Sequence, residues 1–336
     1  MEPRVVVPQG DLGGIAPEVL LHSLSDGTLR EACRPLILGH RVALTAIAAE
    51  LGIAIELQSV ARAEDAFSLP PESPVPVLEL ESPMPTAAPG VPSAEFGMAS
   101  VEAVLRCANL CIEKEADVMV TPPIHKISMH LAGYPFEGQT QILGETCRSN
   151  RYGMLACSGD LRVLVATRHM SLRQAIGKLD PRFVAKQIRL AHEAASETLG
   201  ISAPRIVLAG LNPHAGEGGA FGDEEQLVLE PAIAIAREEW GFHTAGPAVP
   251  DVVFGQGYRG EWDIVIALYH DQAFLPLRML PRESAFTVFV GSNILRTSPM
   301  HGAAYDIART GKADSRAFRF SLERGIDLAK RRLTSA

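Results

Sequence analysis

The sequence predicts an α/β fold with a mostly parallel sheet, and two observations lead to that prediction. Short aliphatic and β-branched runs recur along the chain, and stretches with apolar residues at helical spacing separate them. Strands that are joined by helices of this length pair in parallel through right-handed crossovers. The predicted strands cover residues 5–7, 35–38, 75–78, 118–121, 206–209 and 264–268.

One part of the chain breaks this alternation and predicts antiparallel strands. The segment MLACSGDLRVLVATRH carries Gly159 and Asp160 between two apolar runs, without room for a helix. A Gly-Asp pair in this position is typical of a tight turn, so we expect a hairpin whose second strand ends at His169. A mixed sheet in mid-chain indicates a second domain. We therefore expect one α/β domain in residues 1–130 and 297–336 and another in residues 131–296.

Composition and charge exclude several classes of protein. Of the 336 residues, 47% are hydrophobic and 21% are charged, and no apolar run reaches the roughly 18 residues that a membrane span needs. The net charge of −8 offers no basic face for the phosphates of a nucleic acid. The N-terminus MEPRVVVPQG leads into a strand rather than a signal peptide. We therefore expect a cytoplasmic protein without membrane or nucleic-acid partners.

Three histidines follow predicted buried strands and form the strongest chemical signal in the chain. His169 lies in ATRHMS, His214 in GLNPHAGEGG and His270 in ALYHDQ. Strand ends are where an α/β sheet gathers its reacting groups, and three neutral imidazoles with one open position make a catalytic metal site. The alternative for His270 is a structural pair with its neighbour Asp271. We predict that the three histidines bind a metal.

Two glycine-rich loops also follow predicted strands. In QGDLGGIAPEVL, the residues Gly10, Gly13 and Gly14 precede a predicted helix, so this loop suits either an anion at the helix N-terminus or a turn with unusual backbone angles. In GLNPHAGEGGAFGDEE, the residues Asn212 and Glu217 stand among several glycines. Turn geometry alone does not require so many permissive residues, so we predict that this second loop binds a ligand.

Cationic and polar side chains at further predicted strand ends suit an anionic substrate. Lys126 follows the strand that ends in TPP, although a solvated surface lysine is the simpler interpretation of this residue alone. Gln139 and Thr140 open a predicted helix after Gly138. Arg296 follows an apolar run, and its planar guanidinium can bind a carboxylate or a phosphate through two hydrogen bonds.

The order of three motifs resembles that of a known family. NPHAGEGG, YHDQ and RTSPxHGxAxDIAxTGKAD occur here as they do in the 4-hydroxythreonine-4-phosphate dehydrogenase (PdxA-like) family, and the resemblance runs from Gly10 to about Phe318. It implies two α/β domains around a central cleft, like those of isocitrate and isopropylmalate dehydrogenases. It also implies a homodimer with the active site at the subunit interface. The family's three metal-binding histidines correspond to His169, His214 and His270.

The resemblance further implies an activity and its cofactors. The family oxidises a secondary alcohol of an anionic hydroxy acid with NAD or NADP, and loss of carbon dioxide often follows. The divalent metal, of which zinc is the first candidate before Mg, Mn, Co or Ni, acidifies the substrate hydroxyl. Lys126 and Asp271 become candidates for proton transfer. The residues that would face the nicotinamide cofactor are Asn212, Glu217, Gly218, His301 and Asp306.

The residues implied for substrate binding depart from the family pattern. These positions are Gln139, Thr140, Arg278, Thr287 and Arg296, and Gln139 replaces the histidine of the family's Gly-His-Thr-Glu. Arg278 stands where the family has a lysine, which changes a point charge into a planar fork. We therefore expect intact metal and cofactor binding with an altered substrate pocket, specific for an acid other than 4-phosphohydroxythreonine.

Three other functions remain open at this point. One is a decarboxylating dehydrogenase of the terephthalate dihydrodiol type, whose substrate is a carboxylate rather than a phosphate. Another is a metal-dependent lyase or hydrolase that uses the same histidines without nicotinamide. The third is a catalytically silent relative that acts as a binding or regulatory protein.

Overall fold

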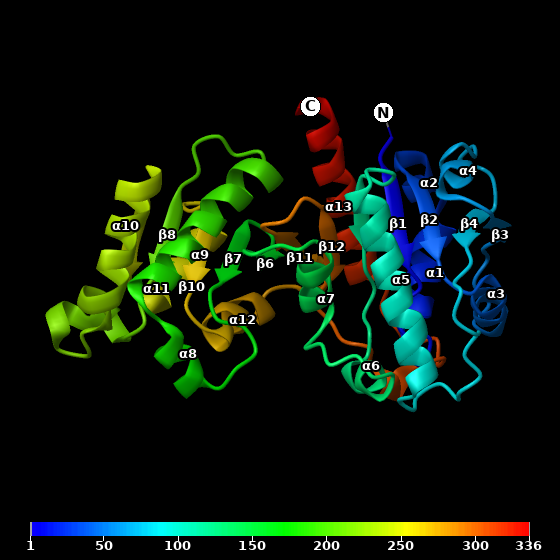
Figure 1. Cartoon of the computed structure of the whole chain (residues 1–336), viewed down its shortest axis with the longest axis horizontal. Coiled ribbons are helices and arrows are strands. Elements are labelled where there is room, and N and C mark those ends of the chain that lie inside the picture. Colours follow the sequence, from blue (N-terminus) through cyan, green and yellow to red (C-terminus); the bar gives the residue numbers. More distant parts are fainter. Residues whose placement is uncertain (1, 336) are drawn as a thin grey trace. The chain divides into compact units, whose positions relative to one another are not determined.

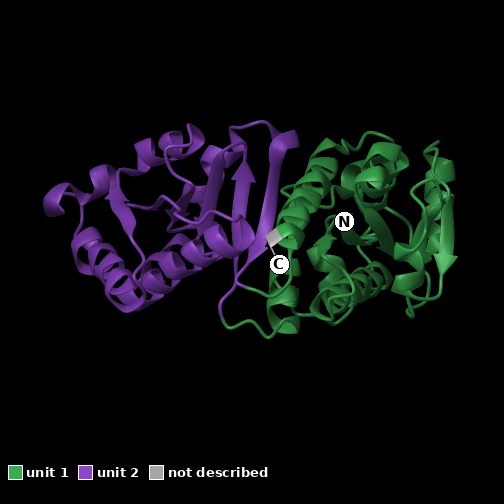
Figure 2. Cartoon of the chain, turned by 90° about the horizontal axis from the view of Figure 1, so that it is seen from above, with its two compact units in different colours: residues 1–150, 292–336 green, residues 151–291 purple. Residues whose placement is uncertain are grey.

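A computed structural model describes residues 2–335, and the chain forms two compact units (Figures 1 and 2). Unit 1 consists of residues 1–150 and 292–336, and unit 2 is the continuous segment 151–291. Each unit is a sheet with helices packed on it, which confirms the predicted α/β class. The sequence predicts the second domain in residues 131–296, whereas unit 2 covers residues 151–291. Helix α7 lies in unit 1 because it packs on α5 of that unit.

The sheet of unit 1 is entirely parallel. Its strands lie in the order β3-β4-β2-β1-β5-β12, so the first strand of the chain is near the centre. Aliphatic residues fill the central strands on both faces, as expected for a parallel sheet that helices cover. The strands are β1 (Arg4–Pro8), β2 (Arg34–Leu38), β3 (Leu57–Val60), β4 (Val75–Leu78), β5 (Val118–Val120) and β12 (Arg296–Pro299).

The helices of unit 1 cover this sheet. The long helix α5 packs on β1, β2 and β5, whereas the last helix, α13, packs on β5 and β12 and contacts α1. Pro17 lies in the first turn of α1, where a missing backbone N–H costs nothing. The helices are α1 (Ala16–Ser25), α2 (Gly27–Ala32), α3 (Arg41–Glu50), α4 (Ala63–Phe67), α5 (Ala94–Ile112), α6 (Lys126–Leu131), α7 (Gln139–Thr146), η5 (Tyr305–Ile307) and α13 (Arg316–Ser335).

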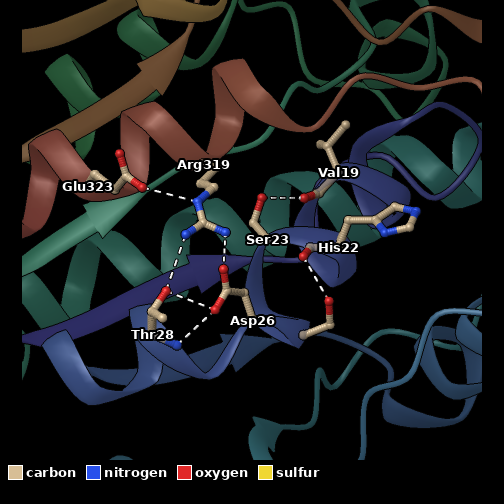
Figure 3. Close-up of polar contacts among 8 residues, drawn as sticks. Val19, His22, Ser23, Asp26, Thr28, Arg319 and Glu323 are labelled. Atoms are coloured by element: carbon tan, nitrogen blue, oxygen red, sulfur yellow. Dashed lines mark hydrogen bonds and ion pairs between the residues drawn. The ribbon is translucent and has the colours of Figure 1, made fainter.

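An ion-pair cluster joins α13 to the start of α2 (Figure 3). Asp26 caps α2 by accepting the backbone N–H of Thr28 at 2.9 Å, and the guanidinium of Arg319 binds the same carboxylate. Arg319 also donates to the hydroxyl of Thr28 at 3.2 Å and to Glu323 at 3.1 Å. The Arg319 contact, together with the hydrogen bonds from Thr28, lowers the pKa of Asp26 to about 2. This cluster thus joins the two segments of the chain that make up unit 1, residues 1–150 and 292–336.

The sheet of unit 2 is mixed, as the sequence predicts. Its strands lie in the order β11-β6-β7-β10-β8-β9, with antiparallel pairs at β11/β6 and β6/β7 and parallel pairs from β7 to β9. The hairpin around Gly159 is confirmed, but β7 ends at Val165 and not at His169. The strands are β6 (Gly153–Ser158), β7 (Leu161–Val165), β8 (Ile206–Ala209), β9 (Thr244–Ala248), β10 (Ile264–Ala267) and β11 (Ala285–Val290).

Helices pack on the sheet of unit 2 as well. Helix α9 contacts β8 and β10, α11 contacts β7, β8 and β10, and α12 contacts β6, β7 and β10. In the part of the chain that the structure describes, no helix is both long enough and apolar enough to cross a bilayer. The helical segments are α8 (Leu172–Lys178), α9 (Pro181–Glu193), η1 (Ala194–Thr198), η2 (Pro213–Gly219), η3 (Glu225–Leu229), α10 (Glu230–Trp240), α11 (Pro250–Tyr258), α12 (His270–Arg278) and η4 (Arg282–Ser284).

Candidate functional site

Three neighbouring parallel strands bring the predicted histidines to one edge of the sheet of unit 2. Strand β10 lies between β7 and β8 and is parallel to both, so the carboxyl ends of all three strands meet at the same edge. His169 follows β7, His270 follows β10 and His214 follows β8. Adjacent strands lie about 4.8 Å apart, so their loops are neighbours. We call His169, His214 and His270 together the histidine edge.

His169 and His270 form a close pair within the histidine edge. Their ring centroids are 5.3 Å apart. His270 Nδ1 lies 2.7 Å from a carboxylate oxygen of Asp271, and because a carboxylate only accepts, the imidazole donates this hydrogen bond. That bond leaves the lone pair on Nε2, while the ring stacks on Phe274 at 4.4 Å. An imidazole that is oriented through Nδ1 in this way suits a metal ligand.

His214 lies in a left-handed segment of backbone. The φ angles of His214, Ala215 and Glu217 are 54°, 52° and 42°, and the glycines between and after them are also positive. A non-glycine residue in this region costs roughly 1–2 kcal/mol. The ring of His214 packs at a tilt against Phe221 of the same loop, with 5.9 Å between centroids. The surrounding structure must therefore hold this segment against its own conformational preference.

The carboxylate of Glu225 holds the left-handed segment at its base. It accepts hydrogen bonds from the backbone of Leu211 at 2.8 Å and of Asn212 at 2.9 Å, and a third from the Asn212 side chain at 2.9 Å. Burial alone would raise the pKa of Glu225, but the hydrogen bonds from Asn212 and Leu211 lower it below its usual value. Glu224 accepts the Asn212 amide as well, at 2.7 Å.

The donor chemistry of the histidine edge fits a divalent metal, although the ligand set is not closed. Within residues 2–335, no three His, Cys, Asp or Glu side chains are already gathered around a position for a metal ion. His169 and His270 meet, whereas the ring of His214 stays with Phe221 on the adjacent loop. Imidazole nitrogens on three adjacent loops are nevertheless the ligand types that zinc and related ions prefer.

The other residues predicted in unit 2 lie in varied surroundings. Arg278 is exposed at the end of α12, and Thr287 is buried on β11 opposite Ala156 of β6. Glu217 and Gly218 are exposed on the left-handed segment.

In unit 1, Arg296 is a buried cation at the start of β12. Its Nε donates to the hydroxyl of Thr121 at 2.8 Å and its Nη2 to the amide oxygen of Gln139 at 3.2 Å. The Gln139 amide in turn donates to the carbonyl of Pro122 at 2.9 Å, and Thr140 follows in α7. Arg296 forms no ion pair with any described residue, and burial lowers its pKa from 12.5 to about 9. A buried guanidinium without a counter-charge attracts an anion.

Lys126, His301 and Asp306 occupy the remaining predicted positions of unit 1. Lys126 is exposed as the first residue of α6, and Asp306 is exposed in η5. His301 hydrogen bonds through Nδ1 to the carbonyl of Gly302 at 3.1 Å. Burial lowers the pKa of His301, and its Nε2 is buried without a hydrogen-bond partner among the described atoms. His301 is therefore the one of these residues that still has a buried polar atom to offer to a ligand.

The first glycine-rich loop is a packing feature. A Cβ atom at Gly13 would lie 2.6 Å from the ring of Phe96, and one at Gly14 would lie 2.4 Å from the carbonyl oxygen of Ala303. Gly10 has a φ of +71°, which favours glycine. Protein atoms thus occupy the space next to these glycines, and this favours the interpretation of the loop as a turn that needs unusual backbone angles.

The sequence did not predict a role for two buried polar residues near the histidine edge. Gln272 stands in the YHDQ motif and Glu225 in GDEE, so both lie next to motifs that drew attention for their histidine and glycines. A polar residue in the first turn of a helix is ordinarily solvated, and no periodicity reveals that these two are 8% and 3% exposed. The available signal was that Gln272 follows the end of β10 within the YHDQ motif and that Glu225 follows the glycine-rich loop after β8.

Comparison with known proteins identifies the relatives of this chain. A family model described as "Pyridoxal phosphate biosynthetic protein PdxA" matches residues 31–324. A 4-hydroxythreonine-4-phosphate dehydrogenase of Desulfosudis oleivorans is 36% identical over 330 residues, which cover 97% of this chain and 96% of that protein. A D-threonate 4-phosphate dehydrogenase of Cupriavidus necator is 34% identical over 332 residues, 98% of each chain.

Solved structures agree with these matches. The crystal structure of 4-hydroxythreonine-4-phosphate dehydrogenase from Klebsiella pneumoniae superimposes with a TM-score of 0.87 and 33% identity, and covers 98% of this chain and 100% of the other. The resemblance that the motifs indicate is thereby confirmed over almost the full length. This chain belongs to the family of the pyridoxal phosphate biosynthetic protein PdxA.

Proposed function

We propose that the chain is a metal-dependent, NAD(P)-linked dehydrogenase that oxidises a secondary alcohol of an anionic hydroxy acid. Its relatives are dehydrogenases, so the chain is an oxidoreductase that acts on a CH–OH group. In this reaction the alcohol loses a hydride to the nicotinamide ring and a proton to solvent, and a ketone forms. The observation that carries the metal dependence is the histidine edge, with its close His169–His270 pair.

His169, His214 and His270 are the residues that would hold the metal. A divalent ion bound there would supply a Lewis acid that lowers the pKa of the substrate hydroxyl. Asp271 fixes the orientation of the His270 ring by accepting a hydrogen bond from Nδ1. Asp271 is also proposed to take part in proton transfer. Zinc suits imidazole ligands best, and Mg, Mn, Co and Ni are the other ions to be compared in the assay.

Arg296 is proposed to bind the anionic group of the substrate. It is buried, it forms no ion pair within the described residues, and the Thr121 hydroxyl and the Gln139 amide hold its guanidinium in place. The amide oxygen of Gln139 accepts from the guanidinium and remains neutral. Since a protonated histidine at position 139 would repel the same guanidinium, the Gln-Arg pair supports an altered pocket around one strong cation.

The remaining assignments are part of the same proposal. Lys126 is a candidate for proton transfer, and Thr140, Thr287 and Arg278 are candidates for substrate contacts. For the nicotinamide cofactor the proposed contacts are Asn212, Glu217, Gly218, His301 and Asp306, of which His301 offers a buried and unpartnered Nε2. The relatives named above act on phosphorylated hydroxy acids, so a phosphorylated substrate is tested first. Loss of carbon dioxide is proposed when the oxidised carbon is β to a carboxylate.

The test measures nicotinamide reduction by the purified protein with a panel of substrates. The panel pairs phosphorylated hydroxy acids with their unphosphorylated forms and includes a dihydrodiol carboxylate, each with NAD and with NADP. We expect reduction with a phosphorylated acid, loss of activity after chelation, and recovery with zinc. Evolved carbon dioxide reports the decarboxylation. Efficient turnover of 4-phosphohydroxythreonine would contradict the altered pocket, and substrate consumption without nicotinamide would favour a lyase.

A further inference from the structure

Gln272 bridges the loops that carry His270 and His214. Its amide oxygen accepts the backbone N–H of Leu268 at 2.7 Å, and its amide nitrogen donates to the backbone carbonyl of Gly210 at 2.7 Å. Leu268 directly precedes the Tyr269-His270 step at the end of β10, and Gly210 is the first residue of the loop that carries His214 after β8. The side chain is 8% exposed, so both hydrogen bonds are shielded from water.

The two neighbours of β10 are connected to it in different ways. On the β7 side, backbone bonds continue beyond the strands, from Ala166 N to the Ala267 carbonyl at 2.8 Å and from Thr167 N to the Leu268 carbonyl at 3.2 Å. The Thr167 hydroxyl adds a bond to the same carbonyl at 2.7 Å. The loops of His169 and His270 are therefore tied together mainly by backbone.

On the β8 side, the backbone turns away from β10. Pairing of β10 with β8 reaches Ile266 and Leu208, and Gly210 N then bonds to the carbonyl of Ala248, the last residue of β9, at 2.8 Å. The Gly210 carbonyl accepts from Gln272. The amide of Gln272 thus connects the His270 loop to the His214 loop, and it can do so because a primary amide offers a donor and an acceptor at once.

We propose that Gln272 is a positioning residue, which sets the separation of the His214 loop from the His270 loop and thereby the metal affinity of the histidine edge. This inference rests on the proposed function, because it requires that the three histidines bind one ion. Gln272 acts through the backbone of Leu268 and Gly210 and does not itself contact the metal. Residues that orient metal ligands from behind commonly change metal affinity by about 10- to 100-fold when they are altered.

The deciding variant is Gln272→Glu, measured at pH 8. Glutamate keeps the shape of the side chain and the acceptor for Leu268 N, but it loses the donor and places an oxygen opposite the Gly210 carbonyl. Competition with a chromophoric chelator measures the zinc dissociation constant, which we expect to rise about 10- to 100-fold. The absorption spectrum of the cobalt-loaded protein reports the number of ligands, and we expect a weaker band once His214 no longer binds.

The matched control is Gln58→Glu in unit 1. Gln58 likewise donates its side-chain amide to a backbone carbonyl, that of Pro74 at 2.9 Å, but it lies outside the unit that carries the histidines. We expect this control to keep the wild-type zinc affinity and cobalt spectrum even if its melting temperature falls. A purely structural effect of losing one amide donor would change the melting temperature of both variants and the zinc affinity of neither.

The outcomes separate this inference from the proposed function. If the wild-type protein binds no zinc, or if His214→Ala binds zinc as tightly as wild type, the three-histidine metal site itself is wrong. If the wild-type protein binds zinc through His214 but Gln272→Glu binds it equally well, the positioning role is overturned. Should Gln272→Glu not fold, Gln272→Met decides the question in the same assay, because it keeps the length of the side chain and removes both hydrogen bonds.

Discussion

Single side chains at this site acquire their chemistry from the atoms that surround them. The His270 ring is oriented because the Asp271 carboxylate accepts from Nδ1, and the Glu225 carboxylate stays charged in a buried position because backbone N–H groups point at it. Arg296 shows the opposite case: a hydroxyl and an amide oxygen accept hydrogen bonds from its Nε and Nη2, but no described carboxylate balances its charge. Each residue is ordinary in the sequence and unusual only in its surroundings.

Arg296→Gln tests the anion site. Removal of a buried cation that pairs with a substrate anion commonly costs 2–5 kcal/mol, so we expect kcat/KM for a phosphorylated substrate to fall about 30-fold or more. Steady-state kinetics with a phosphorylated acid and its unphosphorylated form provide the measurement. The control is Arg182→Gln, which removes an exposed ion pair with Glu239 and should leave both rates unchanged. An unchanged kcat/KM in Arg296→Gln would exclude Arg296 from substrate binding.

At the level of secondary structure, the loops that follow the strand ends form the candidate site. Strands β7, β10 and β8 deliver their histidines to one edge because all three run in the same direction. The loop after β8 then takes a left-handed path, which Glu225 holds at its base. The first turn of helix α13 also makes a long-range contact, because Arg319 binds Asp26, the N-cap residue of α2 (Figure 3).

Gly216→Ala tests the left-handed segment. The new Cβ would lie 2.7 Å from Glu225 Oε2, and alanine is disfavoured at the φ of +78° found here. We expect a loss of about 1–3 kcal/mol in the free energy of unfolding and weaker zinc binding, measured by urea denaturation and chelator competition. Gly177→Ala in α8 is the control, because its Cβ would meet nothing within 4 Å and alanine favours a helix. Equal stability of the two variants would contradict the predicted strain.

Asp26→Asn tests the cluster that joins α13 to α2. The pKa of Asp26 is lowered to about 2 from 3.8, so this carboxylate stabilises the folded state above pH 4, and the contribution is lost as the pH falls through about 2. We expect the variant to unfold more easily than wild type at pH 7 and the difference to shrink between pH 4 and pH 2. Urea denaturation across this range measures it.

Asp160→Asn serves as the control for that series. The Asp160 side chain is 73% exposed and approaches Arg162 only to 3.9 Å. We expect its stability to follow that of wild type at every pH. If the Asp26→Asn difference stayed constant down to pH 2, the ion pair with Arg319 would not be the cause of the effect.

At the scale of the whole molecule, one compact unit is inserted into the sequence of the other. Unit 2 is the continuous segment 151–291 and carries all three predicted metal ligands, whereas unit 1 is assembled from both ends of the chain. The buried strand β12 joins unit 1 by pairing with β5, although nearly three hundred residues separate it from β1 in the same sheet. The sheet of unit 1 is therefore completed by a strand that follows all of unit 2 in the sequence.

The insertion predicts that residues 151–291 fold alone. The segment has the length of an ordinary domain, six strands that pair in the order β11-β6-β7-β10-β8-β9, and its own buried core. We expect the isolated segment to unfold cooperatively and to bind zinc through the same three histidines. Circular dichroism with a thermal melt and chelator competition measure both properties, and His270→Ala in the same segment provides the control for zinc. A segment that folds but binds no zinc would show that unit 2 does not carry the complete metal site.

Local sequence patterns predicted the fold class, most of the strands and the family correctly. Short aliphatic runs such as Ile206–Ala209 and Ile264–Ala267, between turn residues, are typical of buried strands, and the structure confirms both. The patterns missed four strands: β3 (LQSV), β9, whose TAGPA contains glycine and proline, β11 (AFTVFV), and β12, whose polar RTSP is buried beside β5 and α13. Local pattern carries no information about a partner that lies far away in the chain.

The arrangement of the candidate site depends on contacts between segments that are far apart in the chain. The sequence places three histidines after three strands, but their location at one edge depends on the order β7-β10-β8 in the sheet, which no local pattern encodes. The same holds for Gln272, whose amide becomes a bridge because Leu268 and Gly210 come within 2.7 Å of it. Residue types and their spacing specify the available chemistry. Which groups act together is decided by long-range packing, because it alone sets the distances between atoms that are remote in the chain.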